Sequence, residues 1–184
     1  MSASPADVIG FWRAAGPQKW FRKDARFDDA IRLRFEPTHH AAARGEYDAW
    51  MGSPEGCLAL LILLDQFPRN LWRGSPHAFA TDALARRIAR HAVQQDFDQE
   101  VEPALRPFMY LPFEHSEDPA DQDLSVRLCE ALRDAAGDAE TLKWAEHHRD
   151  IIARFGRFPH RNRALGRETT EEEQAFLDDG GFAG

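Results

Sequence analysis

The chain has 184 residues, of which 43% are hydrophobic and 29% charged, a composition typical of a globular protein with its own core. Its 31 acidic and 23 basic residues give a formal net charge of −8, which disfavours non-specific binding to nucleic acid or to an anionic membrane surface. The longest apolar run, residues 57–64, is too short to span a bilayer, and the N-terminus lacks the pattern of a signal peptide. We therefore predict a single domain over residues 1–184, located in the cytoplasm, with no nucleic-acid or membrane partner.

The first half of the chain carries strong helix signals. The Ser4-Pro5 pair predicts the start of a helix that ends before Gly16, because proline is favoured in the first turn of a helix. A second helix is predicted over residues 27–44, with a kink or a break at Pro37. A third is predicted over residues 54–67. Its last turns are apolar on all sides, which indicates a central, buried helix.

In the second half, helices are predicted over residues 76–94, 119–135 and 139–155. A Thr170-x-x-Glu173 capping box predicts a short last helix. Short connections favour antiparallel packing of 54–67 against 76–94, and of 119–135 against 139–155. Because strand signals are few, the pattern predicts an all-α protein, either a compact bundle or a short stack of antiparallel helical hairpins. A less regular stretch is expected around Pro103, Pro107 and Pro112.

Motifs for metals and cofactors are missing from the sequence. Cys57 and Cys129 lie within apolar helical patterns, which indicates buried free thiols rather than metal ligands. There is no Walker A or GxGxxG loop for a nucleotide, and no GxSxG elbow of a serine hydrolase. Glu36 and His39 have the spacing found in di-iron helical bundles, but only one copy is present. We therefore predict no metal and no cofactor.

Two segments of the chain share a pattern. Residues 67–70 read Phe-Pro-Arg-Asn, and residues 158–162 read Phe-Pro-His-Arg-Asn. In each, the Phe-Pro pair is expected to end a helix and to place an arginine and an asparagine beyond its C-terminus. These side chains could cap the last carbonyl groups of the helix. They could equally bind a ligand, since loops often carry functional side chains, and the sequence leaves both interpretations open.

Asp65 stands near the end of the apolar helix, where a carboxylate is costly unless it is paired. Its candidate partners are Arg69, Arg157 and Arg161. The pairing could be a structural ion pair, or it could form a polar pocket in which Asp65 orients a ligand-binding group. We predict that the two Phe-Pro segments lie together, with Asp65 within salt-bridge distance of an arginine from the other segment.

Three of the eight histidines, His115, His148 and His160, lie where an apolar pattern meets polar residues. Each is a candidate acid, base or hydrogen-bonding group near neutral pH, although such histidines are more often structural. Glu117 stands beside the start of a helix for which Asp118 is the expected N-cap, a position where an anion is favoured. Solvated helix faces are the expected location of His39, His40, His77 and His91.

Several motifs together resemble a known family. The three main ones are residues 64–70 (Leu-Asp-Gln-Phe-Pro-Arg-Asn), 115–118 (His-Ser-Glu-Asp) and 154–162 (Arg-Phe-Gly-Arg-Phe-Pro-His-Arg-Asn). In order, and over nearly the whole chain, they are similar to the bacterial domain-of-unknown-function family 924. The resemblance implies a compact, all-helical, tetratricopeptide-like fold. It implies no reaction, because the family has no assigned activity.

Two functions fit these observations. The first is binding of a small anionic ligand in a polar pocket of Arg, His and Asp side chains, with or without catalysis. The second is a tetratricopeptide-like scaffold that binds a protein or peptide, a hypothesis that depends on fold analogy alone. A closed pocket would favour the first, and an open groove with exposed aromatic residues the second. The catalytic candidates are His115, His148, His160 and Asp65, and the ligand-binding candidates are Arg69, Asn70, Glu117, Arg157, Arg161 and Asn162.

Overall fold

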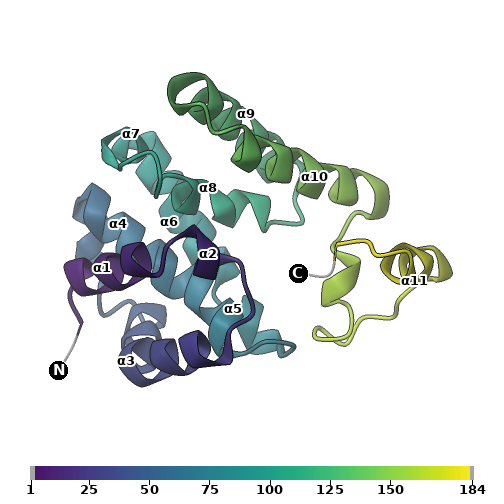
Figure 1. Cartoon of the computed structure of the whole chain (residues 1–184), viewed down its shortest axis with the longest axis horizontal. Coiled ribbons are helices and arrows are strands. Elements are labelled where there is room, and N and C mark those ends of the chain that lie inside the picture. The colour runs from purple at the N-terminus through teal and green to yellow at the C-terminus, as the bar shows by residue number, and fades with distance from the viewer. Residues whose placement is uncertain (1–2, 183–184) are drawn as a thin grey trace. The chain divides into compact units, whose positions relative to one another are not determined.

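The computed structural model describes residues 3–182, and all regular secondary structure within them is helical (Figure 1). The predicted all-α class is therefore confirmed. The described residues divide into two compact units: unit 1 contains residues 3–73 and 77–112, and unit 2 contains residues 74–76 and 113–182. No helix of the described residues is long and apolar enough to cross a membrane. The single-domain organisation and the tetratricopeptide-like pairing stay predictions.

Unit 1 is built from helices of very different lengths, from one turn to the 19 residues of α3 (Ala25–Ala43). They are α1 (Pro5–Ala15), α2 (Pro17–Trp20), α3 (Ala25–Ala43), the 3-10 turn η1 (Asp48–Gly52), α4 (Pro54–Leu61), the π-helical turn η2 (Ile62–Gln66), α5 (Phe67–Leu71), α6 (Asp82–Gln94) and α7 (Phe97–Glu100). The 3-10 turn η3 (Pro76–Phe79) and helix α8 (Pro107–Glu114) each have residues in both units. Unit 2 continues with α9 (Pro119–Ala136), α10 (Ala139–Phe155), the 3-10 turn η4 (Pro159–Arg161) and α11 (Glu171–Asp178).

Local capping signals set several helix starts as predicted. Ser4 and Asp7 form a reciprocal capping box at the start of α1. Ser53 caps α4, and Asp118 caps α9 through the backbone N–H of Ala120.

Helix α3 is continuous through Pro37, so of the two predicted outcomes the break is wrong and the kink stays a prediction. Proline leaves the carbonyl four residues back, that of Leu33, without its helical donor. Leu33 is 85% exposed, which allows water to bond that carbonyl instead.

The central helix is buried as predicted, but it does not end at Pro68. After α4 the chain widens into one π-helical turn, in which the N–H of Phe67 bonds to the carbonyl of Ile62, and it then continues as α5. In that wider register Pro68 would reach the carbonyl of Leu63, but proline has no N–H to donate. The prediction therefore failed because side chains bond the carbonyl oxygens of this turn, two of them from residues distant in the sequence.

Three side chains bond the carbonyl oxygens of the π-helical turn. His39 Nδ1 lies 2.8 Å from the carbonyl oxygen of Leu63, the hydroxyl of Thr81 donates to that of Leu64 at 2.5 Å, and Arg69 Nη1 donates to that of Asp65 at 2.6 Å. A carbonyl oxygen only accepts, so Nδ1 of His39 carries a proton. Burial lowers the pKa of His39 and keeps its ring neutral. His39 is thus a buried structural group and does not lie on a solvated face.

Substituting Thr81 by valine should lower the free energy of unfolding by about 1–2 kcal/mol, because a buried carbonyl loses one of its donors. The side chain keeps its shape, so the packing term is small. The measurement is urea denaturation of the wild type and of T81V. The T81S variant keeps the hydroxyl and should recover most of the loss. Equal stability of T81V and the wild type would show that the carbonyl of Leu64 does not need Thr81.

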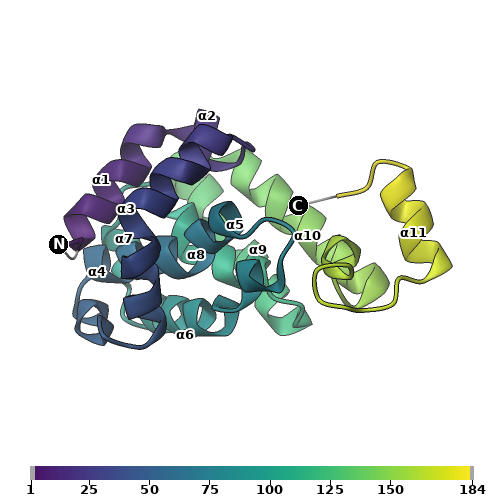
Figure 2. The ribbon, with the colours of Figure 1, turned by 90° about the horizontal axis from the view of Figure 1, so that it is seen from below.

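The continuation of the helix places Phe67 in the core of unit 1. Its ring centroid lies 5.7 Å from that of Trp12 and 5.2 Å from that of Phe35, and Trp12 also packs edge-on against Phe108 at 5.4 Å. Such tilted and edge-to-face contacts are favourable for aromatic rings. Helix α3 contacts both the π-helical turn and α5 (Figure 2). Helix α4 also contacts α6, as the predicted hairpin requires.

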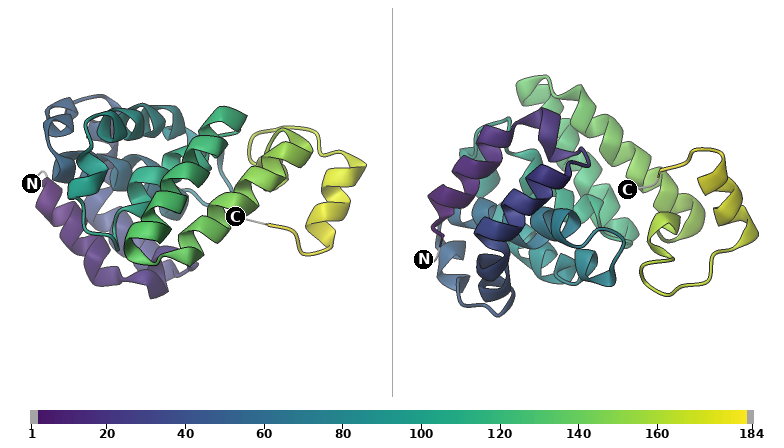
Figure 3. Two further views of the ribbon diagram at one scale, coloured as in Figure 1. Left: turned by 90° about the horizontal axis from the view of Figure 1, so that it is seen from above. Right: turned by 60° about the horizontal axis from the view of Figure 1, so that its bottom comes forward.

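In unit 2, helices α9 and α10 pack side by side in antiparallel directions, which confirms the second predicted hairpin (Figure 3, left). Gly137 ends α9 in the left-handed conformation and begins the tight turn between the two helices. A small core forms where α10 ends, around Ile151, Ile152 and Phe158.

Both cysteines are buried free thiols, as predicted. Burial raises the pKa of Cys57 to about 11 and that of Cys129 to about 12. Since the thiolate is the reactive form, we expect neither thiol of the native protein to react with an aromatic disulfide reagent at about pH 8, and both to react in urea. Absorbance of the released thiolate measures the reaction. Fast reaction of either thiol without urea would contradict the burial.

Candidate functional site

The most notable polar pair of unit 2 joins Glu114 and His148. Glu114 is the last residue of α8 and His148 lies on α10; they are 3% and 5% exposed. Nδ1 of His148 lies 3.0 Å from Oε1 of Glu114 and 2.8 Å from the carbonyl oxygen of Trp144. An ionised carboxylate and a carbonyl can only accept, so Nδ1 is the protonated nitrogen. Nε2 is then the atom left to exchange a proton or to meet a ligand.

The backbone around Glu114 is held by Gln122, a fully buried residue of α9. Nε2 of Gln122 donates to the carbonyl oxygens of Glu114 at 2.7 Å and Ser116 at 2.6 Å. Ser116 in turn donates its hydroxyl to Asp121 at 2.8 Å. Because these groups fix the chain on both sides of His115, the carboxylate of Glu114 is presented to His148 by a rigid support.

The three histidines singled out in the sequence lie together in unit 2. The ring of His148 lies 6.4 Å from that of His115, and both His148 and His160 lie 5.6 Å from the ring of Phe158, measured between centroids. The guanidinium of Arg161 lies 4.6 Å from the centroid of the same phenylalanine ring. Imidazole and guanidinium groups thus gather around Phe158. The described residues contain no group of three or more His, Cys, Asp or Glu side chains arranged to hold a metal ion.

Other predicted ligand-binding residues of unit 2 belong to an ionic network. Glu117 accepts two hydrogen bonds from Arg167, at 2.7 and 3.0 Å, and one from the backbone N–H of Phe158 at 2.8 Å. Arg167 also donates to Oδ1 of Asn162 at 2.9 Å. Burial raises the pKa of Glu117, but the hydrogen bonds from Arg167 and Phe158 outweigh it, so the pKa is lowered.

The network continues through Glu173, the capping-box residue of α11, which is 3% exposed. It accepts from Nε and Nη2 of Arg157 at 2.6 and 2.8 Å and from Nδ2 of Asn162 at 3.2 Å. Arg157, Asn162 and Glu117 therefore fasten the second Phe-Pro segment to the C-terminal part of the chain. Their role in ligand binding stays a prediction.

The first Phe-Pro segment lies in unit 1 and is paired there. Asp65 is 1% exposed, accepts from Gln66 at 2.6 Å and lies 3.3 Å from Nη1 of Arg69. Arg69 also binds Asp82 through two parallel hydrogen bonds, and Asn70 donates to Asp28 at 2.8 Å. Arg69 is thus the partner of Asp65 within unit 1. Contact between the two Phe-Pro segments, which belong to different units, stays a prediction.

Glu114 and Phe182 are functional candidates that the sequence reasoning missed. Three prolines suggested an irregular stretch before residue 113, whereas the chain forms α8, which carries Glu114. Phe182 follows α11 and lacks any periodic signal, yet its ring centroid lies 4.6 Å from that of His148. The sequence signal for this site was Glu114 itself, an acidic residue directly before the candidate His115.

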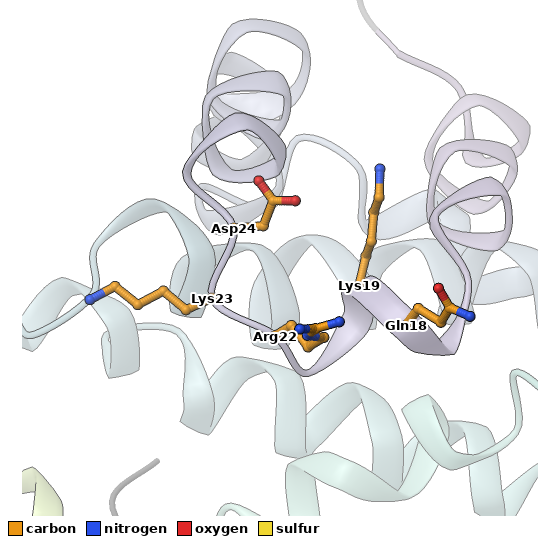
Figure 4. Close-up of a pocket in the computed structure, with 5 residues that line it drawn as sticks. All are labelled: Gln18, Lys19, Arg22, Lys23 and Asp24. Carbon is orange, nitrogen blue, oxygen red and sulfur yellow. The ribbon is translucent and has the colours of Figure 1, made fainter.

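Two open depressions of about 390 Å³ each lie on the surface of the described residues. The one in unit 1 is lined by Lys19, Arg22, Lys23 and two neighbours, and Figure 4 shows the ends of these basic side chains pointing in different directions. They do not converge on one anion. The second lies along α10 and includes Trp144 and His147, both of which contact Phe182, so it adjoins the histidine cluster.

Fold and site together define a wholly helical class of protein, in which a buried Glu-His pair is carried by α8 and α10. The chain belongs to DUF924, a family of bacterial proteins of unknown function whose model matches residues 8–181, as the motif resemblance predicted. It is similar to the solved structure of a protein of unknown function from Agrobacterium tumefaciens, with 51% identity and a TM-score of 0.91 over 96% of this chain and 97% of that one. No curated protein matches the sequence.

Proposed function

We propose that unit 2 binds a small anionic molecule next to His148 and that Nε2 of His148 exchanges a proton with it. The observation that carries this proposal is the 3.0 Å contact between Nδ1 of His148 and Oε1 of Glu114. A carboxylate on one ring nitrogen fixes the tautomer and stabilises the imidazolium formed when the other nitrogen takes a proton.

The charges around His148 support an anion as the ligand. His160 and the guanidinium of Arg161 lie beside Phe158, which packs against His148, and the ring of His115 lies 6.4 Å from that of His148. Glu114 is engaged by His148 itself, and Glu117 is engaged by Arg167. The side chains closest to Phe158 are thus imidazole and guanidinium groups, a composition that favours a carboxylate or a phosphate over a cation.

A thermal-shift screen with a library of anionic metabolites tests the proposal. A ligand at one hundred times its dissociation constant adds about 2.7 kcal/mol of stability, roughly 5–10 °C in Tm for a chain of this size. We expect the hits to stabilise the wild type but not the H148Q variant, in which glutamine can still donate to Glu114.

The matched control is H91Q. His91 bonds to the carbonyl of Met51 at 3.0 Å, as His148 does to that of Trp144, but it belongs to unit 1. The hits should stabilise H91Q as they do the wild type. Equal stabilisation of H148Q and the wild type, or no stabilisation by any anion, would contradict the proposal.

A further inference from the structure

Phe182 occupies an aromatic cage next to His148. Its ring centroid lies 4.6 Å from that of His148, 5.0 Å from His160, 5.9 Å from His147 and 6.2 Å from Trp144. The ring is nearly perpendicular to the three imidazoles, with interplanar angles of 70°, 88° and 82°. Edge-to-face contact of this kind is specific to flat aromatic rings, because it pairs the positive edge of one ring with the negative face of another.

A glycine turn brings Phe182 back toward α10, where Figures 1 and 2 show the yellow chain returning after α11. Gly180 has a φ of +80°, and the N–H of Gly181 bonds to the carbonyl of Phe176 at 2.9 Å. A Cβ on Gly181 would lie 2.4 Å from that carbonyl oxygen, so this position requires glycine.

Phe182 is held in unit 2 by side-chain packing. It packs against the small core of Ile151, Ile152 and Phe158, and against the imidazoles of His148 and His160. Its ring is half-buried, whereas His148 is 5% exposed with Phe182 in place. A ligand ring that packs against His148 in this place would therefore have to displace the ring of Phe182.

We propose that the cage is a subsite for an aromatic ring, that Phe182 fills it in the absence of ligand, and that the ligand is an aromatic carboxylate. This inference rests on the proposed function for its anionic group, while the ring contacts carry its aromatic group. The ligand ring replaces the ring of Phe182 against His160, His147 and Trp144. Its carboxylate then lies beside the imidazole of His148, which Glu114 orients.

Calorimetric titration of the full chain with three probes tests this. Phenylacetate carries a ring and a carboxylate, cyclohexylacetate has the same charge without an aromatic ring, and benzyl alcohol has the ring without the charge. Removing the internal competitor in F182A should tighten phenylacetate binding roughly tenfold or more. Cyclohexylacetate should bind F182A at least several-fold more weakly than phenylacetate does. The matched control is F21A, which removes an exposed phenylalanine of unit 1 and should bind phenylacetate as the wild type does.

Further variants separate the ring subsite from the proton-exchange site. Benzyl alcohol should still bind F182A/H148Q, only a few-fold more weakly than F182A, because one of the four rings of the cage is lost. W144A in the F182A background should weaken its binding in the same way. Trp144 is 43% exposed, so the W144A substitution should leave the hydrophobic core of unit 2 intact. No binding of benzyl alcohol to F182A, or phenylacetate binding unchanged by F182A, would overturn the ring subsite. If benzyl alcohol binds but phenylacetate loses nothing in F182A/H148Q, the proposed function fails and the ring subsite stands.

Discussion

Replacing Arg69 with alanine should lower the free energy of unfolding by about 3–5 kcal/mol, the usual cost of removing one partner of a buried ion pair. Nη1 and Nη2 of Arg69 bind the two carboxylate oxygens of Asp82 at 3.0 and 3.1 Å, and Nη1 lies 3.3 Å from Oδ1 of Asp65. Burial lowers the pKa of Arg69, but Asp65 and Asp82 outweigh it and raise the pKa overall. Without Arg69, two acidic side chains of unit 1 lose the cation between them. Urea denaturation followed by circular dichroism measures the loss.

The matched control is R133A. Arg133 binds the neighbouring Asp134 at 2.8 Å, but both side chains are exposed, so its removal should leave the free energy of unfolding nearly unchanged. In a double-mutant cycle, D82A should cost less in the R69A background than in the wild type, because the pair is already broken. A cost of R69A no larger than that of R133A would show that the cluster contributes little to stability.

Asp65→Ala in the same experiment separates a structural role from a functional one. A loss of about 3–5 kcal/mol would identify Asp65 as part of a structural ion pair. Unchanged or increased stability would indicate a polar group kept for ligand binding, since such groups often reduce stability.

The helices that the sequence predicted best are those whose starts depend on neighbouring residues. Ser4 with Asp7 and Thr170 with Glu173 form their capping boxes within one turn, so the pattern and the structure coincide. The course of the chain past Pro68 depends on His39 and Thr81 instead, which lie far from it in the sequence and complete the hydrogen bonds there. Local pattern cannot reveal such partners.

The histidine cluster was predicted in part for a similar reason. His148 was a candidate because it lies on an arginine-rich helix, and His160 because it belongs to the second Phe-Pro segment. The packing of unit 2 brings both against Phe158. Glu114 was not predicted because it lies on α8, where the prolines favoured an irregular stretch over a helix. Phe182 depends on a turn made by two glycines near the end of the chain. Tertiary contacts decide which side chain fills a site, and the hydrophobic periodicity of a sequence does not predict such contacts.

Replacing Glu173 with glutamine should cost about 2–4 kcal/mol at neutral pH. The lower end of this range allows for Arg157, whose side chain is 29% exposed. Glu173 accepts hydrogen bonds from Arg157, Asn162 and the backbone N–H of Thr170. Its carboxylate therefore joins α11 to the second Phe-Pro segment. The hydrogen bonds from Arg157 are the main reason why the pKa of Glu173 is lowered from 4.5 to about 2.

The pH dependence of this loss distinguishes the charge from the packing of Glu173. A carboxyl whose pKa is lower in the folded state stabilises the fold above its unfolded pKa, and this contribution disappears as the pH falls toward the folded value. The difference between the wild type and E173Q should therefore be largest above about pH 5 and should shrink steadily between pH 4.5 and pH 2. The control is E172Q, because Glu172 is 65% exposed in its ion pair with Arg154 and should show little loss at any pH. A loss in E173Q that is independent of pH would mean that shape and hydrogen bonding, and not the carboxylate charge, hold α11 in place.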